Sequence, residues 1–328
     1  MESKKQEDKY FEQMKEIQII ILSYLENDNE TFYQNFIQYY QNQKIQENKQ
    51  QVKAILYLLE KIAKHHRRSN NFFEKIEKIL IFLESSIKQS FSNKDIFNIF
   101  KGNKRILLFL IDQKIIIPDS FVARSISNGK YKKRKYPEYF CPEFKEFLNT
   151  KVELFENNPD EFQNLRRIGE NELPICQIIR KDSLEEFISY IEKHNISLTT
   201  HFKPSIFETN SFLLKREPSL IQYSAFFGSY QIFKYLMKRI NEEYIEDSYD
   251  VKYCNDDLYE EYKENLMWLY SIHGNNPMIM KKLKNEYYKP KNNSFLECYI
   301  ESIKCHHFDI TKSLEKVVTD DIFSYCLK

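Results

Sequence analysis

Residues 219–236 read SLIQYSAFFGSYQIFKYL, and a related pattern returns at 266–283 as LMWLYSIHGNNPMIMKKL. In both stretches an apolar run ends at a small residue and a glycine, and a second apolar run follows. The aligned pairs are Leu220 with Leu266, Ala225 with Ser271, Gly228 with Gly274, Ile232 with Met278, and Phe233 with Ile279. A third stretch, CYIESIKCHHFDITKSL at 298–314, has Cys305 at the glycine position. The chain therefore contains an internal repeat.

Each copy is interpreted as two short helices around a tight turn. Glycine at positions 228 and 274 supplies the left-handed conformation that ends a first helix. Asn276 followed by Pro277 is typical of a helix start, with a capping side chain and then proline at the first helical position. An earlier capping signature, Ser183-x-x-Glu186, predicts one more second helix. We expect Gly228→Val to destabilise the protein by more than about 1 kcal/mol, because a β-branched residue is disfavoured in that conformation.

The spacing of the copies indicates an insertion. Cys305 follows Gly274 by 31 residues, whereas Gly274 follows Gly228 by 46. The longer interval contains residues 242–264. This segment has ten acidic residues and two lysines, a local net charge of 2 − 10 = −8. So much like charge keeps a segment exposed, although a mixed acidic and aromatic loop can also dock a basic partner.

Helical spacing also dominates the N-terminal part of the chain. The first 117 residues contain no proline and one glycine. Apolar residues fall on single helical stripes over 52–63 and 72–87. Between 126 and 160 a basic run is followed by Pro137 and Pro142, which predicts a loop or linker. The fold class is thus all-α, with a helical region at 1–125, a basic linker at 126–160 and a repeat domain at 161–328.

Composition removes several function classes. The five glycines are never closer than 27 residues, so the dinucleotide-binding and phosphate-loop fingerprints and the nucleophile elbow of hydrolases are absent. Basic and acidic residues number 49 and 48, which leaves no net field for nucleic acid or a membrane surface. No apolar run approaches the ~20 residues of a membrane span. We expect six free cysteine thiols and a cytoplasmic protein, with nuclear entry left open by the basic run.

The repeat pattern Leu-x-x-x-x-Ala-x-x-Gly-x-x-x-Ile is similar to the ankyrin repeat. More specifically, residues 206–212, 224–229, 269–277 and 303–310 resemble an uncharacterised ankyrin-related domain common in parasitic protist protein families. The resemblance covers roughly residues 165–315. It implies a stacked helix-turn-helix solenoid that binds proteins and has no assigned catalytic residues. The insertion at 242–264 departs from that pattern.

Thiols and imidazoles crowd the third copy. The residues are Cys298, Cys305, His306 and His307. They are potential zinc ligands, but C-x₆-C-H-H matches no common zinc signature and Cys305 stands at the turn position. We therefore expect no metal and no cofactor, and a melting temperature that chelation leaves unchanged. His273 lies near Ser271, yet one histidine does not make a catalytic triad, and we expect no enzyme activity.

The candidate interaction surface combines two stretches. Its basic part comprises Lys130, Lys132, Lys133, Arg134 and Lys135. Its repeat part comprises Phe226, Phe227 and His273. The expected function is a non-catalytic protein-interaction module with a protein partner. The alternatives are a nucleic-acid-binding protein that uses the basic run, and an enzyme whose dispersed site the sequence does not reveal.

Overall fold

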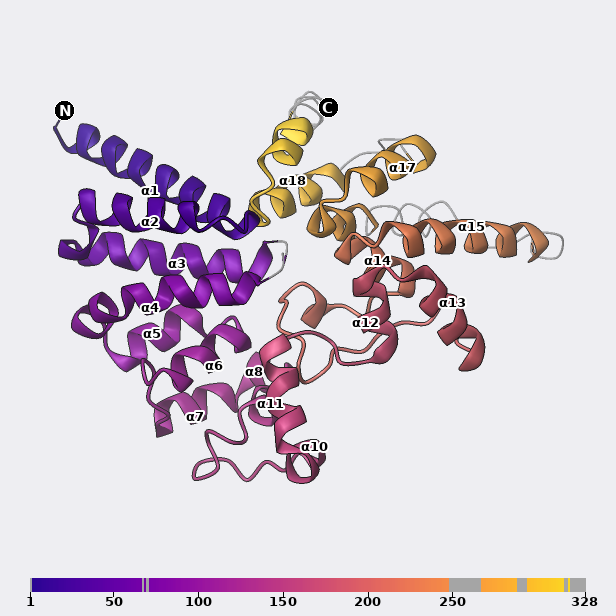
Figure 1. The fold of residues 1–328 in the computed structure, drawn as a ribbon, viewed down its shortest axis with the longest axis horizontal. Helices are drawn as coiled ribbons and strands as arrows, with labels where there is room; N and C mark the ends of the chain where they lie inside the picture. Colours follow the sequence, from indigo (N-terminus) through magenta and orange to yellow (C-terminus); the bar gives the residue numbers. More distant parts are fainter. Residues whose placement is uncertain are drawn as a thin grey trace, which may run out of the picture. The chain divides into compact units, whose positions relative to one another are not determined.

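The computed structural model describes residues 2–66, 68, 71–247, 267–287, 294–315 and 318, and it confirms the all-α class (Figure 1). Within these ranges there is no strand, and an isolated antiparallel bridge joins His201 to Ser219. Contacts divide the chain into two compact units, Met1–Lys64 with Arg68–Gly169, and His65–Arg67 with Glu170–Lys328. Among the described residues, no helix combines the length and apolar character that crossing a membrane requires.

The first unit is built from helices whose apolar stripes face its core. The helices are α1 (Glu2–Glu26), α2 (Glu30–Asn42), η1 (Ile45–Glu47), α3 (Lys49–His65), α4 (Phe72–Ser90), α5 (Asn93–Phe100), α6 (Lys104–Asp112), α7 (Ser120–Ile126), α8 (Gly129–Lys133), α9 (Tyr136–Tyr139), α10 (Glu153–Asn157) and α11 (Pro159–Ile168). The stripe predicted over 52–63 lies in α3. Its six residues are at most 2% exposed: Val52, Ile55, Leu56, Leu59, Ile62 and Ala63. The stripe over 72–87 lies in α4 and is equally buried. Helical periodicity therefore located this core correctly.

The basic stretch is part of the first unit and not a linker. It forms the short helices α8 and α9, separated by Lys135 in the left-handed conformation. The Tyr136 and Tyr139 side chains are fully buried, and their hydroxyls donate to the carbonyls of Lys101 and Arg166, both at 2.9 Å. These hydrogen bonds join the segment to the end of α5 and to α11. The segment therefore belongs to the first unit, which ends at Gly169.

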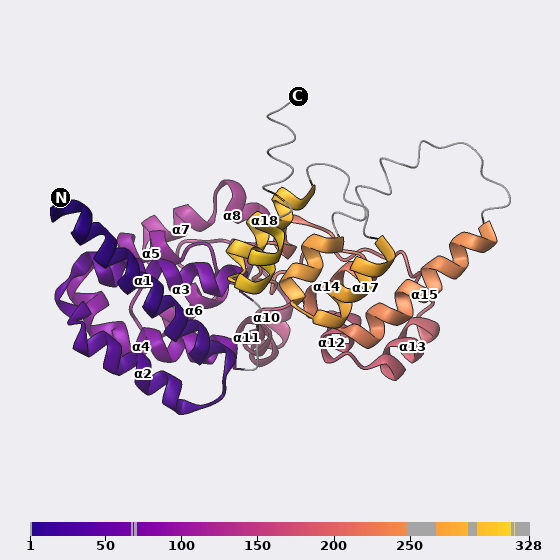
Figure 2. The same cartoon turned by 90° about the horizontal axis from the view of Figure 1, so that it is seen from above.

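The second unit is a series of helix pairs (Figure 2). Its described helices are α12 (Pro174–Lys181), α13 (Leu184–Lys193), η2 (Leu213–Lys215), α14 (Leu220–Phe227), α15 (Tyr230–Asp247), a helix at 267–274, α17 (Pro277–Tyr287), α18 (Ser294–Lys304) and a helix at 308–315. α12 packs against α13 and α14, and α15 packs against α13, α14 and α17. The pairs α12–α13 and α14–α15 are therefore in contact, and α15 also contacts α17 of the following pair. Most of the predicted acidic insertion, residues 248–264, lies outside the described residues.

The turns correct the alignment of the repeats by one residue. Gly228 has φ +71° and ends α14, as predicted. Gly274, however, does not adopt a positive φ, and the left-handed residue of the second copy is Asn275 at φ +43°. In the third copy it is His306 at φ +59°, and an earlier pair turns at Asp182 with φ +53°. The helix predicted from the Ser183 capping signature does begin at Leu184, but the Ser183 hydroxyl makes no capping bond.

Position 274 requires glycine for a different physical reason than position 228. A Cβ atom at position 274 would lie 2.2 Å from the carbonyl oxygen of Ala225 and 2.9 Å from the amide nitrogen of Gly228. Glycine is required there because two consecutive turns touch through their backbones. The prediction that Gly274 supplies a left-handed turn was therefore wrong, and close packing explains this glycine.

Hydrogen bonds join the first two turns. The Asp182 carboxylate accepts from the amides of Gln231 and Ile232, each at 3.0 Å, and so caps the start of α15. In the reverse direction, the Ser229 hydroxyl donates to the carbonyl of Ile179 at 2.5 Å. A carboxylate at a helix N-terminus satisfies free amides and complements the helix dipole.

The later turns are joined in the same way. The Asn276 side-chain amide donates to the Gly228 carbonyl at 2.7 Å. Asn276 also caps α17, since its oxygen accepts from the Met278 amide at 2.9 Å, and Pro277 is the first residue of that helix as predicted. The Asn275 amide lies 3.3 Å from Nδ1 of His307 in the following turn. A chain of polar contacts thus connects four consecutive turns.

Candidate functional site

Three chemically distinct side chains meet where the second and third copies of the repeat pack together. His273 belongs to the helix at 267–274, Glu301 lies on α18, and Cys305 follows the end of α18. All three are buried, at 3%, 8% and 0% exposed. Their ligand atoms all lie within 4.8 Å of one another. We refer to these three residues as the His-Glu-Cys cluster.

The geometry of the cluster orders its members in a row. Nε2 of His273 lies 3.1 Å from Oε1 of Glu301. Sγ of Cys305 lies 3.4 Å from Nδ1 and 4.0 Å from Nε2 of the same imidazole. The second carboxylate oxygen of Glu301 accepts from Nζ of Lys304 at 2.8 Å, which fixes the orientation of the carboxylate.

Aromatic side chains hold the imidazole in place. The His273 ring centroid lies 4.3 Å from that of Phe212 and 4.8 Å from that of Phe226. Phe226 is itself only 7% exposed, whereas Phe227 is partly exposed. Phe226 and His273 were predicted as part of an interaction surface, and that prediction was wrong because they pack on each other inside the unit.

Burial sets the protonation state of the cluster. Burial lowers the pKa of His273, so this imidazole is neutral near pH 7. Burial also opposes ionisation of Glu301, but the hydrogen bond from His273 and the ammonium of Lys304 outweigh it and lower the pKa of Glu301 to about 2. Burial and the nearby Glu301 raise the pKa of the Cys305 thiol well above its usual value. The row therefore consists of a thiol, a neutral imidazole and a carboxylate.

A row of thiol, imidazole and carboxylate resembles a nucleophile, its base and an orienting acid. A catalytic cysteine, however, requires a lowered pKa and access for its substrate. Cys305 has neither, since it is fully buried and its pKa is raised. The same three side chains are good ligands for a transition metal.

The zinc set considered from the sequence does not assemble as a group. Of its four members, Cys305 alone belongs to the cluster found among the described residues. His306 occupies the left-handed turn, and His307 contacts Asn275. The structure brings in His273 and Glu301 instead, 32 and 4 residues before Cys305. The four-residue spacing between Glu301 and Cys305 is about one helical turn. It could have predicted from the sequence that these two side chains lie on the same face.

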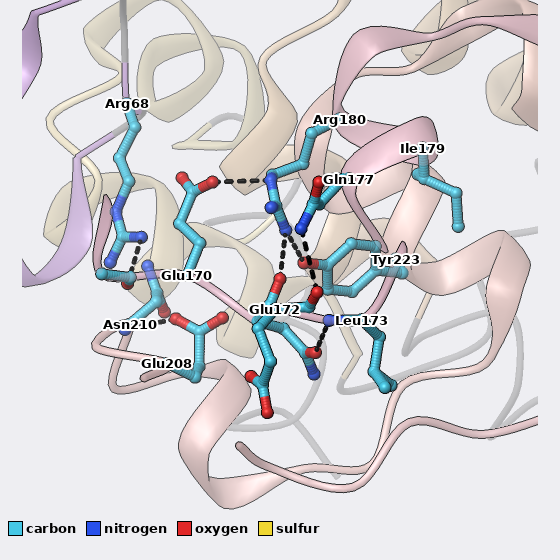
Figure 3. A network of polar contacts seen from close by, with 12 residues as sticks. Arg68, Glu170, Glu172, Leu173, Gln177, Ile179, Arg180, Glu208, Asn210 and Tyr223 are labelled. Carbon is cyan, nitrogen blue, oxygen red and sulfur yellow. Dashed lines mark hydrogen bonds and ion pairs between the residues drawn. The ribbon is translucent and has the colours of Figure 1, made fainter. Parts of the chain in front are cut away.

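A second polar network lies at the start of the same unit (Figure 3). Nε of Arg180 contacts the Glu170 carboxylate at 2.7 Å, and its Nη1 donates to the Asn171 carbonyl and the Tyr223 hydroxyl, both at 2.9 Å. Tyr223 is 1% exposed, and burial raises its pKa well above the usual value. This network fastens the segment before α12 to α14, which is a structural task that the sequence analysis missed.

The predicted basic surface is largely open to solvent. Lys130, Lys132, Lys133 and Lys135 are exposed, and Arg134 is partly exposed. Lys135 contacts Glu138 at 3.5 Å, and the Arg134 carbonyl accepts from Lys104 at 3.4 Å. Most of the charge at this surface is thus available to a partner.

No family model, curated protein or solved structure matches this chain.

Proposed function

We propose that the chain is a non-catalytic protein-interaction module whose second unit is an ankyrin-like solenoid. The polar contacts between consecutive turns support this arrangement, since each repeat of a solenoid contacts its neighbours in sequence. The four described cysteines, Cys141, Cys176, Cys298 and Cys305, are buried free thiols, which supports a reducing cytoplasmic location.

One observation carries the proposal, and it concerns the residue three positions before the left-handed turn. In the first three helix pairs this residue is Ile179, Ala225 or Ile272, and each is 0% exposed. In the last described pair it is Ile303, which is 47% exposed. At two of these positions the next turn is in contact, since the Ile179 carbonyl accepts from the Ser229 hydroxyl and the Ala225 carbonyl faces Gly274. Ile303 belongs to the same kind of surface and stays open.

Neighbouring residues extend this open surface. Leu296 and Ile300, also on α18, are 45% and 43% exposed. They precede Ile303 by seven and three residues and so lie on one face of the helix. Exposed apolar patches of this kind mark protein-binding sites. We name these three residues the α18 face and propose that it binds a helical partner with a complementary apolar stripe, which would take the place of a further helix pair.

The test compares partner capture by the wild-type chain with capture by an Ile300→Ser, Ile303→Ser variant, followed by mass spectrometry and titration of the captured protein. Burial of each isoleucine contributes about 1.5 kcal/mol or more, so the double variant is expected to bind its partner at least tenfold more weakly. Leu173→Ser is the matched control, because Leu173 is 41% exposed on the same unit but lies outside the α18 face. Equal capture by the wild type and the double variant would contradict the proposal.

The exposed basic surface keeps nucleic-acid binding as the second candidate function. Each phosphate contact contributes a slope of about −0.9 to the plot of log K against log salt for duplex DNA, so one short cluster supports weak binding only. Changing Lys132, Lys133 and Arg134 to alanine is expected to preserve folding and partner capture. Submicromolar binding of wild type to RNA or DNA at ~150 mM salt, lost in that triple variant, would favour the nucleic-acid function instead.

A further inference from the structure

The His-Glu-Cys cluster offers three protein ligands from two consecutive helix pairs in a setting that excludes bulk water. Zinc bonds measure ~2.3 Å to thiolate sulfur, ~2.0–2.1 Å to imidazole nitrogen and ~2.0–2.2 Å to carboxylate oxygen, so neighbouring ligand atoms in a tetrahedral site are about 3.3–3.6 Å apart. From Nε2 of His273, Oε1 of Glu301 is 3.1 Å away and Sγ of Cys305 is 4.0 Å away. Nδ1, the other nitrogen of the ring, lies 3.4 Å from the same sulfur. With Nε2 as the imidazole ligand, these two distances differ from the tetrahedral values by about 0.3 and 0.4 Å, and all three ligand atoms lie within 4.8 Å of one another.

We propose that His273, Glu301 and Cys305 bind one divalent transition metal ion, with Zn²⁺ as the preferred ion. Thiolate, imidazole and carboxylate together suit zinc and disfavour magnesium and calcium, which take oxygen ligands. A water molecule that enters with the ion completes the tetrahedral ligand set. The proposed site replaces the expectation that the chain binds no metal, which was argued from Cys298, Cys305, His306 and His307.

The surroundings of the cluster support it as a built site. Lys304 holds the distal oxygen of Glu301, and the rings of Phe212 and Phe226 fix the plane of the imidazole. Outer contacts of this kind orient metal ligands in characterised sites. The carbonyl of Cys305 lies 2.8 Å from Nδ1 of His66, which also belongs to the second unit. Metal binding converts the thiol to a thiolate and releases its proton to solvent, so the apparent affinity rises with pH.

The metal site would also join the second and third copies of the repeat. His273 is 28 residues before Glu301 and 32 before Cys305, so one ion would cross-link two helix pairs. Because the unfolded chain does not hold these ligands together, binding of the ion stabilises the folded state.

The test uses the untagged chain, stripped with a chelator and reconstituted with Co²⁺ as a spectroscopic substitute for Zn²⁺. We expect one Co²⁺ per chain, a thiolate-to-cobalt charge-transfer band, displacement of Co²⁺ by Zn²⁺, and a higher melting temperature with Zn²⁺. Cys305→Ala is expected to abolish the band. Glu301→Gln, which preserves the shape of the side chain, is expected to keep the band and weaken binding at least about tenfold.

Cys298→Ala is the matched control, because Cys298 is a buried thiol on α18, the helix that carries Glu301, and lies outside the cluster. This variant is expected to retain the band and the Zn²⁺-induced shift in melting temperature. Circular dichroism verifies that each variant is folded, and Glu301→Gln provides the comparison if Cys305→Ala unfolds. Absence of the band in the wild type, equal metal binding by wild type and Glu301→Gln, or loss of the band in Cys298→Ala would each overturn the proposal and leave the cluster as buried hydrogen bonds only.

Discussion

Replacing Gly274 with alanine sets local helix propensity against the contact between two turns. Gly274 is the last residue of the helix at 267–274 and does not adopt a positive φ. Alanine is favoured over glycine in a helix by about 1 kcal/mol, so propensity alone predicts a more stable protein. The added Cβ would, however, lie 2.2 Å from the carbonyl oxygen of Ala225. That oxygen belongs to the backbone and has no rotamer with which to move away.

The size of the effect follows from the required movement. Cβ atoms essentially never approach another heavy atom closer than 3.0 Å, so the two turns must separate by at least 3.0 − 2.2 = 0.8 Å. Overpacking of this kind costs about 1–3 kcal/mol. The separation also stretches the 2.7 Å hydrogen bond from Asn276 to the Gly228 carbonyl, which contributes about 1 kcal/mol. After subtraction of the propensity gain of about 1 kcal/mol, Gly274→Ala is expected to destabilise the second unit by about 1–3 kcal/mol.

Urea unfolding and hydrogen exchange of the peptides covering 219–236 and 267–283 measure this change. Gly129→Ala is the control: Gly129 has φ +53° but no heavy atom within 4 Å of its added Cβ, and it lies in the other unit. It is expected to cost about 1–2 kcal/mol of backbone strain and to leave exchange in the second unit unchanged. If Gly274→Ala is as stable as the wild type or more so, the inferred contact between the turns is wrong.

Three further perturbations test individual contacts. Asp182→Ala removes the carboxylate that caps α15 and is expected to lower stability by about 1–2 kcal/mol in urea unfolding; an unchanged midpoint would argue against the link between the first two turns. Arg166 is fully buried and forms two hydrogen bonds with Glu143, at 2.7 and 2.8 Å. Arg166→Lys cannot preserve both and is expected to cost about 2–3 kcal/mol, with thermal unfolding as the measurement. The hydroxyl and amide of Ser92 lower the pKa of Asp95 below 3.8. The stabilisation from this cap is therefore present above pH 3.8 and is lost as the pH falls through the folded pKa; an NMR titration should show Ser92→Ala raising that pKa.

The sequence alone was enough for features that depend on a few neighbouring residues. Helical stripes in α3 and α4 follow from apolar residues three and four positions apart, and these were located correctly. The turn at Gly228 and the helix start at Asn276 and Pro277 also follow from local rules, because a left-handed residue and a capping side chain act within one helical turn.

Features that depend on the approach of distant segments needed the tertiary structure. The sequence predicted a left-handed conformation at both Gly228 and Gly274, but close packing against the Ala225 carbonyl explains the second glycine. The sequence predicted a linker at 126–160. The buried hydrogen bonds of Tyr136 and Tyr139 show that this stretch is part of the first unit.

The His-Glu-Cys cluster shows the same division. Each of its residues is visible in the sequence, yet His273 lies 28 and 32 positions from its partners. Repeat spacing predicts which helix pairs are neighbours, but the direction of each side chain depends on the register in which the turns stack. That register is set by the backbone contact at Gly274 and by the polar contacts between turns, which no local pattern encodes.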